Sequence, residues 1–318
     1  MYIRRESKKL YFKIEESAAG RTLEQYLRQQ LQLTRAQIRS LKFQPEGLCI
    51  NGQKARVTQQ LQTGDELAVE LEKEAMSSEQ LVPVYEPLEI LYEDADLIAV
   101  WKPGGLVLHP SHGHYEDTLS NRLYGYLLGK KAKAVIRSIG RLDRDTSGIV
   151  VFAKNQIAAA RLWQQKEEGR FWKEYLAVCQ GSLVPEQAAA DDKKQNQGPK
   201  DADWYTIDTP IGPKEGTLMQ MCVRSDGQRA VTHYQILQRS SRHTVIRVRI
   251  ETGRTHQIRV HMASIGYPLV GDCLYGNQDA ELQLFAWKCQ LEQPFSGETI
   301  TLSRTVSSTF EGLTEPGE

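Results

Sequence analysis

The stretch that decides the fold of this chain is GRLDRDTSGIVVFAK (140–154), in which a polar loop runs directly into five consecutive apolar residues. Such an apolar run is typical of a buried strand. A loop that enters a core strand can hold a carboxylate such as Asp143 in a fixed position. The ordinary interpretation of Asp, Thr, Ser and Gly in this order is a turn, because these residues are the commonest in turns. The stretch alone leaves both interpretations open.

Outward from this stretch, other apolar or alternating runs predict further strands. The run TVIRVRI (244–250) alternates apolar residues with Arg247 and Arg249, which predicts one buried and one basic face. Helices are predicted at 118–128 and 255–265. Strands outnumber helices and do not alternate with them in βαβ fashion. We therefore predict an α+β fold with a mainly antiparallel, mixed sheet. The other strand candidates are LIAVW (97–101), WKEYLAVC (172–179) and VTHYQIL (231–237).

The chain has 318 residues, and this length corresponds to about two domains. Residues 1–74 carry a net charge of +3 in a chain that is neutral overall. Within them, RTLEQYLRQQL (21–31) predicts a helix, and Thr34 with Gln37 predicts a capping box that opens a second one. Two short strands are predicted around 48–50 and 66–71. We predict a small α/β domain at 1–74, a linker at 75–87, and a larger domain at 88–318 with a flexible insertion at 186–203.

Composition excludes several classes of protein. The five cysteines are scattered without a Cys-x-x-Cys pair, so neither a disulfide framework nor a zinc knuckle is expected. The longest apolar runs have five residues, whereas a membrane helix needs about 20. The first residues lack the apolar stretch of a signal peptide. We expect a cytoplasmic protein that contacts no membrane and holds no metal.

Four segments, in order, resemble the RluA-type RNA pseudouridine synthases. The first is the loop already quoted, and the others lie before and after it in the chain. Residues 1–74 are similar to the RNA-binding domain first seen in ribosomal protein S-four, through GRTLEQYL (20–27) and LTRAQIRSL (33–41). The three further catalytic segments are YEDADLIAVWKPGGLVLHP (92–110), WKEYLAVCQG (172–181) and TGRTHQIRVH (252–261).

The resemblance implies a pseudouridine synthase fold and an isomerase that needs no cofactor. It assigns the nucleophilic or charge-stabilising carboxylate to Asp143, leaving open whether this group attacks the ribose or the base. Tyr175 is implied to stack on the uracil and to transfer a proton, and Arg259 to pair with Asp143. Arg141 is implied to fill the gap left by the extruded nucleotide. The other implied substrate-binding residues are Ile258, Arg254 and His256.

RNA binding is expected from two basic surfaces. One comprises Arg35, Arg39 and Lys42, which lie on one face of the second predicted helix. The other is the face with Arg247 and Arg249. For both, the alternative is that the charges are merely solvated. We expect a monomer that acts on uridines of large-subunit (23S) ribosomal RNA. A synthase directed at transfer RNA, and a non-catalytic RNA-binding or ribosome-assembly factor, remain alternatives.

Overall fold

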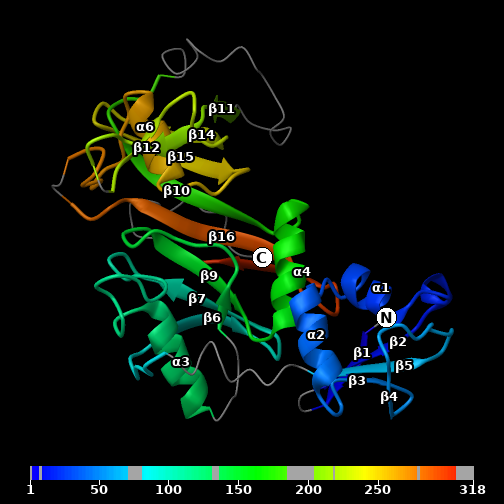
Figure 1. Cartoon of the computed structure of the whole chain (residues 1–318). Coiled ribbons are helices and arrows are strands. Elements are labelled where there is room, and N and C mark those ends of the chain that lie inside the picture. The colour runs from blue at the N-terminus through cyan, green and yellow to red at the C-terminus, as the bar shows by residue number, and fades with distance from the viewer. Residues whose placement is uncertain are drawn as a thin grey trace.

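The computed structural model describes residues 2–6, 9–70, 81–130, 136–184, 204–217, 219–277 and 280–305. Three sheets organise these residues: one near the N-terminus, a larger one in the rest of the chain, and a small two-stranded one (Figure 1). Of the predicted linker, only residues from 81 onward are described, and the predicted insertion at 186–203 lies outside the described residues. Among the described residues, no helix is both long and apolar enough to cross a membrane.

The N-terminal sheet has five strands in the order β1-β2-β5-β3-β4. Thr22 and Thr34 each form a capping box at the start of a helix, α1 and α2, and the second of these was predicted from sequence. Buried residues such as Leu23, Leu27 and Leu67 form one core with the helices and the sheet. The elements are β1 (Tyr2–Glu6), β2 (Lys9–Lys13), the 3-10 helix η1 (Glu16–Ala18), α1 (Leu23–Gln29), α2 (Arg35–Phe43), β3 (Leu48–Ile50), β4 (Gln53–Lys54) and β5 (Glu66–Glu70).

The larger sheet has the strand path β11-β14-β15-β10-β16-β9-β7-β6, with β17 paired to β16 and β8 to β9. Its pairs are antiparallel except for β16 with β9, which confirms the predicted mixed, mainly antiparallel sheet. Its strands are β6 (Glu89–Glu93), β7 (Leu97–Lys102), β8 (Arg137–Ser138), β9 (Ser147–Ala153), β10 (Trp172–Gln180), β11 (Trp204–Asp208), β14 (Val231–Arg239), β15 (His243–Ile250), β16 (Leu284–Glu292) and β17 (Thr299–Ser303). The helices are α3 (Leu119–Gly129), α4 (Gln156–Glu167) and α6 (Gln257–Ser264), and β12 (Ile211–Pro213) pairs with β13 (Met221–Val223).

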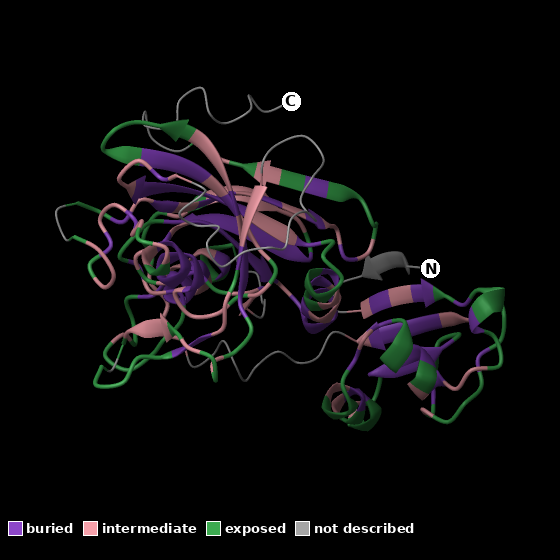
Figure 2. Cartoon of the chain, turned by 90° about the horizontal axis from the view of Figure 1, so that it is seen from above, coloured by how far each residue is buried: buried purple, intermediate pink, exposed green. Residues whose placement is uncertain are grey.

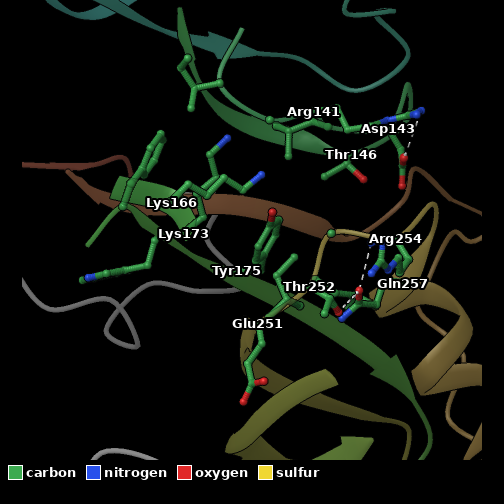
Figure 3. A pocket seen from close by; sticks show the side chains of 18 of the residues that line it. Arg141, Asp143, Thr146, Lys166, Lys173, Tyr175, Glu251, Thr252, Arg254 and Gln257 are labelled. Carbon is green, nitrogen blue, oxygen red and sulfur yellow. Dashed lines mark hydrogen bonds and ion pairs between the residues drawn. The ribbon is translucent and has the colours of Figure 1, made fainter. Parts of the chain in front are cut away.

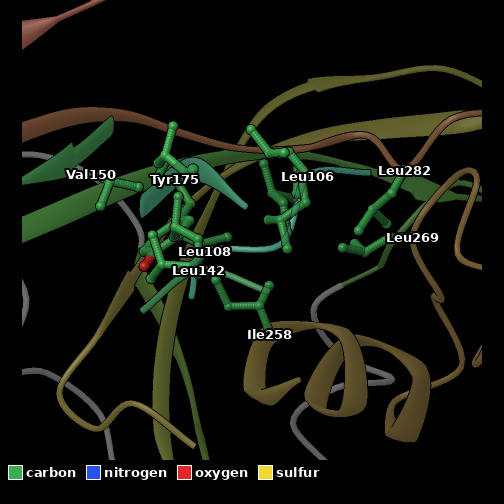
Figure 4. Packing of buried hydrophobic residues seen from close by; sticks show 14 of the residues in the cluster. Leu106, Leu108, Leu142, Val150, Tyr175, Ile258, Leu269 and Leu282 are labelled. Atoms are coloured by element: carbon green, nitrogen blue, oxygen red, sulfur yellow. The ribbon is translucent and has the colours of Figure 1, made fainter. Parts of the chain in front are cut away.

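Both faces of this sheet are buried, and alternation along β10 shows how. Tyr175 and Ala177 belong to the core that contains α3 and α6, whereas Leu176 and Val178 belong to the core that contains α4. Figure 2 shows the buried residues concentrated in the middle of the two larger sheets, and Figure 4 shows Tyr175 packed with Leu142 and Ile258. The alternation along β10 therefore places the Tyr175 side chain on the face of the sheet that packs against α6.

Helix α4 also contacts the N-terminal sheet. Ile157 is part of the N-terminal core, and Gln37 of α2 donates a hydrogen bond to Gln156. Arg161 donates to the Gln30 carbonyl at 3.2 Å and to the Pro294 carbonyl at 2.7 Å. One helix thus joins the two parts of the chain.

The sequence patterns identified the helices α1, α2, α3 and α6 and the strands β3, β5, β7, β9, β10, β14 and β15, but missed the other elements, including β16 in the middle of the large sheet. The five runs expected as strands in the larger domain are strands, and the two helices predicted there are helices. The strands β1 and β2 were not predicted. Nor was α4, whose sequence QIAAARLWQQKE has a weak apolar period, and whose start is capped by Asn155.

Candidate active site

One pocket of about 930 Å³ brings together all the residues expected to catalyse the reaction or bind the target nucleotide. Its walls come from the loop before β9, from strand β10, and from the segment that opens α6 (Figure 3). Asp143 and Arg259 are 116 residues apart in the chain. The sheet gathers these segments, because β16 alone separates β9 from β10, and β15 lies on the other side of β10. The predicted residues that line the pocket are Arg141, Asp143, Tyr175, Arg254, His256, Ile258 and Arg259.

Asp143 lies in the loop between β8 and β9, and its side chain is 18% exposed. Its nearest cationic partner is Arg141, whose Nη2 lies 4.0 Å from the Asp143 Oδ1. The Arg141 side chain is itself 67% exposed, at the pocket's edge. The carboxylate is thus sheltered yet accessible, and an exposed arginine lies beside it.

The loop is anchored by Lys102, which is fully buried at the end of β7. Its Nζ donates to the carbonyl oxygens of Pro103, Leu106 and Arg144 at 2.8, 2.9 and 2.7 Å. Burial lowers the pKa of Lys102 to about 8, although Asp145 and Asp143 act in the opposite direction. From sequence, Lys102 was named only as part of a motif. The signal for its role in anchoring the loop was a lysine at the end of an otherwise apolar strand.

Gly148 sets the exit of the loop into β9. A Cβ at this position would lie 2.5 Å from the Cβ of Ala286 and 2.6 Å from its backbone oxygen, and the glycine φ is +141°. A side chain would therefore force β9 and β16 apart at their short parallel contact. The close approach fixes where the Asp143 loop ends and β9 begins.

Tyr175 is 7% exposed and points from β10 toward the side of the pocket formed by the Asp143 loop (Figure 3). Burial, and then the negative charge of Asp143, raise the pKa of its hydroxyl above the usual range. The phenol is therefore protonated at neutral pH. In this state it can donate a hydrogen bond to a bound base.

Arg259 has a different partner from the one expected. It is 1% exposed and forms a bidentate pair with Asp272, at 2.8 Å from Nε to Oδ2 and 2.7 Å from Nη2 to Oδ1. Burial acts to lower the pKa of Arg259, but the Asp272 hydrogen bonds and the charges of Asp272 and Asp143 raise it. The expected direct pair with Asp143 is wrong: both carboxylate oxygens of Asp272, in the loop between α6 and β16, accept hydrogen bonds from the guanidinium instead. Asp143 acts on Arg259 only as a longer-range charge.

His256 and Arg254 are held by neighbouring residues. His256 adopts a left-handed conformation (φ 56°), and its Nδ1 lies 2.9 Å from the Tyr275 hydroxyl. Burial lowers the pKa of His256, so its imidazole is neutral at pH 7. Arg254 donates from Nε to the Arg229 carbonyl at 2.9 Å. Among the described residues, no cluster of three or more His, Cys, Asp or Glu could hold a metal ion.

Further residues of the pocket were not identified from sequence. Thr146 is 2% exposed, and its hydroxyl has no hydrogen-bond partner in the described part of the chain. Lys173, two residues before Tyr175 on β10, is half-buried and donates to the Ile149 carbonyl at 2.8 Å. The burial of its ammonium group lowers its pKa to about 8. Apolar Leu142 and Leu284 complete the wall. A partly dry site in which the Asp143 carboxylate is sheltered but accessible suits chemistry on a nucleoside.

The residues expected to bind RNA outside the pocket fall into two groups. Arg35, Arg39 and Lys42 are all exposed on α2, as their spacing predicted. Arg247 and Arg249 instead lie beside Glu174, a carboxylate that is 2% exposed, at 3.4 and 2.9 Å. Sequence analysis missed Glu174, because the pairing arises between neighbouring strands β10 and β15. The two arginines thus neutralise a buried charge as well as facing outward.

The chain is similar to known proteins in sequence and in fold. Residues 96–264 match the RNA pseudouridylate synthase family. The chain is 35% identical over 257 residues to the uncharacterized RNA pseudouridine synthase YhcT of Bacillus subtilis, covering 79% of this chain and 78% of that one. It is 33% identical over 320 residues to ribosomal large subunit pseudouridine synthase D of Xanthomonas campestris, covering 94% and 90%. The solved structure of human RNA pseudouridylate synthase domain containing 1 matches in fold, with a TM-score of 0.53 at 24% identity, over 70% of this chain and 85% of that chain.

Proposed function

The chain belongs to the RNA pseudouridylate synthase family, and we propose that it isomerises specific uridines of large-subunit ribosomal RNA, as a monomer in the cytoplasm. It is an isomerase that converts uridine to pseudouridine in RNA. The ribosomal target is supported by relatives named ribosomal large subunit pseudouridine synthase D, which are 33 to 38% identical to this chain. The observation that carries the proposal is the meeting of Asp143, Tyr175 and Arg259 in one pocket.

The reaction breaks the bond between the ribose C1′ and the uracil N1 and forms a bond from C1′ to C5. The proton that leaves C5 is balanced by one that is gained at N1, so no electrons are exchanged. We propose that the Asp143 carboxylate is the group that attacks or stabilises the nucleoside while the base rotates. The protonated Tyr175 hydroxyl holds the base, and Arg259 contributes positive charge behind Asp143.

Access to the base requires that the uridine leave its stack. The exposed Arg141 beside Asp143 is placed to fill the gap that the extruded nucleotide leaves. Ile258, 5% exposed, and Leu142 supply an apolar wall for the uracil ring. Arg254 and His256 line the same pocket and are proposed to contact the neighbouring ribose and phosphate.

We also propose that residues 1–74 form an RNA-binding domain similar to that of ribosomal protein S-four. The support is a separate sheet and core, with Arg35, Arg39 and Lys42 exposed on one helix. A linker at 75–87 would connect it to the catalytic domain at 88–318. Arg247 and Arg249 would extend the RNA-binding surface onto β15.

Pseudouridine mapping of total RNA tests the proposed target. Cells that lack the protein should miss pseudouridine at a small set of large-subunit ribosomal positions, and the wild-type chain should restore it. Asp143→Asn is the matched control and should restore none. Missing sites confined to transfer RNA would replace the ribosomal assignment with the alternative target. No missing site in any RNA would refute the proposed function.

A further inference from the structure

The candidate active-site pocket extends to an exposed tryptophan that the proposed mechanism does not use. Trp163 lies on α4 and lines the same pocket as Asp143, yet it is 43% exposed. We propose that Trp163 and Lys166 form a second base-binding subsite, which holds an unpaired nucleotide adjacent to the target uridine. This inference rests on the proposed function, and it concerns how the RNA substrate is held.

The environment of Trp163 suits stacking. Lys166, one turn later on α4, places its Nζ 4.8 Å from the centroid of the Trp163 ring. A large aromatic side chain that is left partly in water carries a free energy penalty that a stacking partner relieves. Every base has a π-face, so an exposed indole is a sequence-tolerant platform for an unpaired nucleotide.

Lys166 connects this platform to the catalytic loop. A Cβ built on Gly140 would lie 3.0 Å from the Lys166 Nζ, so the ammonium rests against the residue that precedes Arg141. Within the described part of the chain, no carboxylate lies within 4.0 Å of this ammonium. The nearby Glu168, also at the pocket, is instead bound by Arg170 at 2.8 Å. Lys166 is therefore free to meet an RNA phosphate.

Trp172 also lines the pocket, but it is a poorer platform. Each ring has one cation 4.8 Å from its centroid, Lys166 at Trp163 and Arg249 at Trp172, but Trp172 is only partly exposed, whereas Trp163 is exposed. The volume of about 930 Å³ lies near the upper end of the usual range for pockets, roughly 300–1,000 Å³, which leaves room beyond a single base. These observations favour Trp163 as the stacking side chain.

The test measures dissociation constants for the full chain and a ribosomal RNA fragment that carries the uridine identified by mapping. The fragment is made intact, with an abasic nucleotide immediately 5′ of the uridine, or with one immediately 3′. For wild type, one abasic fragment should bind about 5- to 10-fold more weakly, the lower end of base–aromatic stacking effects. Trp163→Leu should bind the intact fragment equally weakly, and should lose no further affinity on that abasic fragment.

Two further variants and a control keep the result interpretable. Trp163→Phe retains a stacking ring and should keep most of the affinity, and its melting temperature checks the fold. Lys166→Gln should reduce the logarithmic salt slope of binding by about 0.7, the value for one single-strand phosphate contact. Tyr85→Leu removes an aromatic side chain that is 73% exposed outside the pocket-lining residues, and should behave as wild type.

The outcomes separate this inference from the function on which it rests. Pseudouridine formation by wild type, together with equal abasic penalties in wild type and Trp163→Leu, would refute the subsite alone. The absence of any abasic effect in wild type would refute it as well. Failure of wild type to form pseudouridine in any RNA would refute the proposed function, and the subsite with it.

Discussion

Replacing Asp272 by Asn tests whether the buried Arg259 depends on this carboxylate. Asn keeps the size of the side chain but removes its charge, and turns one of its two acceptors into a donor that faces the guanidinium. Both partners are buried, at 1% and 0% exposure, with contacts of 2.8 and 2.7 Å. Removing one partner of such a pair costs about 3–5 kcal/mol, because the other charge is left buried and unpaired.

We expect the lower end of this range, about 3 kcal/mol, since the amide oxygen of Asn can still accept one hydrogen bond. Asp272 Oδ1 also accepts from the backbone N–H groups of Leu274 and Tyr275, at 3.0 and 3.1 Å. These two backbone hydrogen bonds survive in Asp272→Asn if the amide oxygen occupies the position of Oδ1. For a domain of 150–250 residues, a loss of this size lowers the melting temperature by roughly 6–12 °C.

The assay is thermal unfolding of wild type, Asp272→Asn, Arg259→Met and the double variant. When Arg259 is absent, loss of the Asp272 charge should cost less stability. The double variant should therefore be about 2–3 kcal/mol more stable than the sum of the two single losses would predict. Asp226→Asn, which affects an exposed ion pair with Arg224, is the control and should leave the melting temperature unchanged. Additive effects, or a shift below about 2 °C for Asp272→Asn, would refute the reasoning.

Three other predictions concern activity, RNA affinity and pH. Asp143→Asn should abolish isomerisation while RNA affinity stays nearly intact; residual turnover within about tenfold of wild type, which is roughly 1.4 kcal/mol in barrier, would contradict the role of the carboxylate. Replacing Arg35, Arg39 and Lys42 together by Gln should flatten the logarithmic salt slope of RNA binding by about two units, with turnover at saturating RNA scarcely changed; an unchanged slope would mean that these charges are only solvated. Burial lowers the pKa of Lys102 from 10.5 to about 8, so between these pH values the unfolded chain binds more protons than the folded one. Lys102 should therefore make the free energy of unfolding rise with pH, by up to about 3 kcal/mol. Urea unfolding at pH 7.5 and 9.5 should show a smaller rise for Lys102→Met, and an equal rise in both proteins would exclude Lys102 as its source.

The elements that could be predicted from sequence are those with a strong local pattern. The alternation in 244–250 places Ile246 and Val248 in the core and Arg247 on the other face, as the structure confirms. The Thr34 and Gln37 side chains mark the start of α2, because a capping box uses only neighbours in the chain. By contrast, α4 has a weak apolar stripe, since it is covered on two sides, by the large sheet and by the N-terminal core.

The residues of the candidate site were named from motif resemblance, and the fold shows that they share one pocket. Their partners could not be read in the same way. Asp272 lies 13 residues after Arg259, and Glu174 lies 75 residues before Arg249. Neither separation along the chain matches a helix or strand period that would indicate a contact. Trp163 is likewise an ordinary helix residue in the sequence, and becomes a pocket residue only because α4 packs beside the Asp143 loop.

The sequence by itself determined the strand-rich fold class, the short capped helix of the N-terminal region, and the identity of Asp143, Tyr175 and Arg259 as the residues to examine. These depend on the order of side chains along the chain, through local period, capping and motif. Only the tertiary structure decided which charges are paired, which lysines are buried, and that the pocket reaches Trp163. The physical reason is that pairing and burial depend on which segments the folded sheet brings together, and therefore on contacts between residues far apart in the chain.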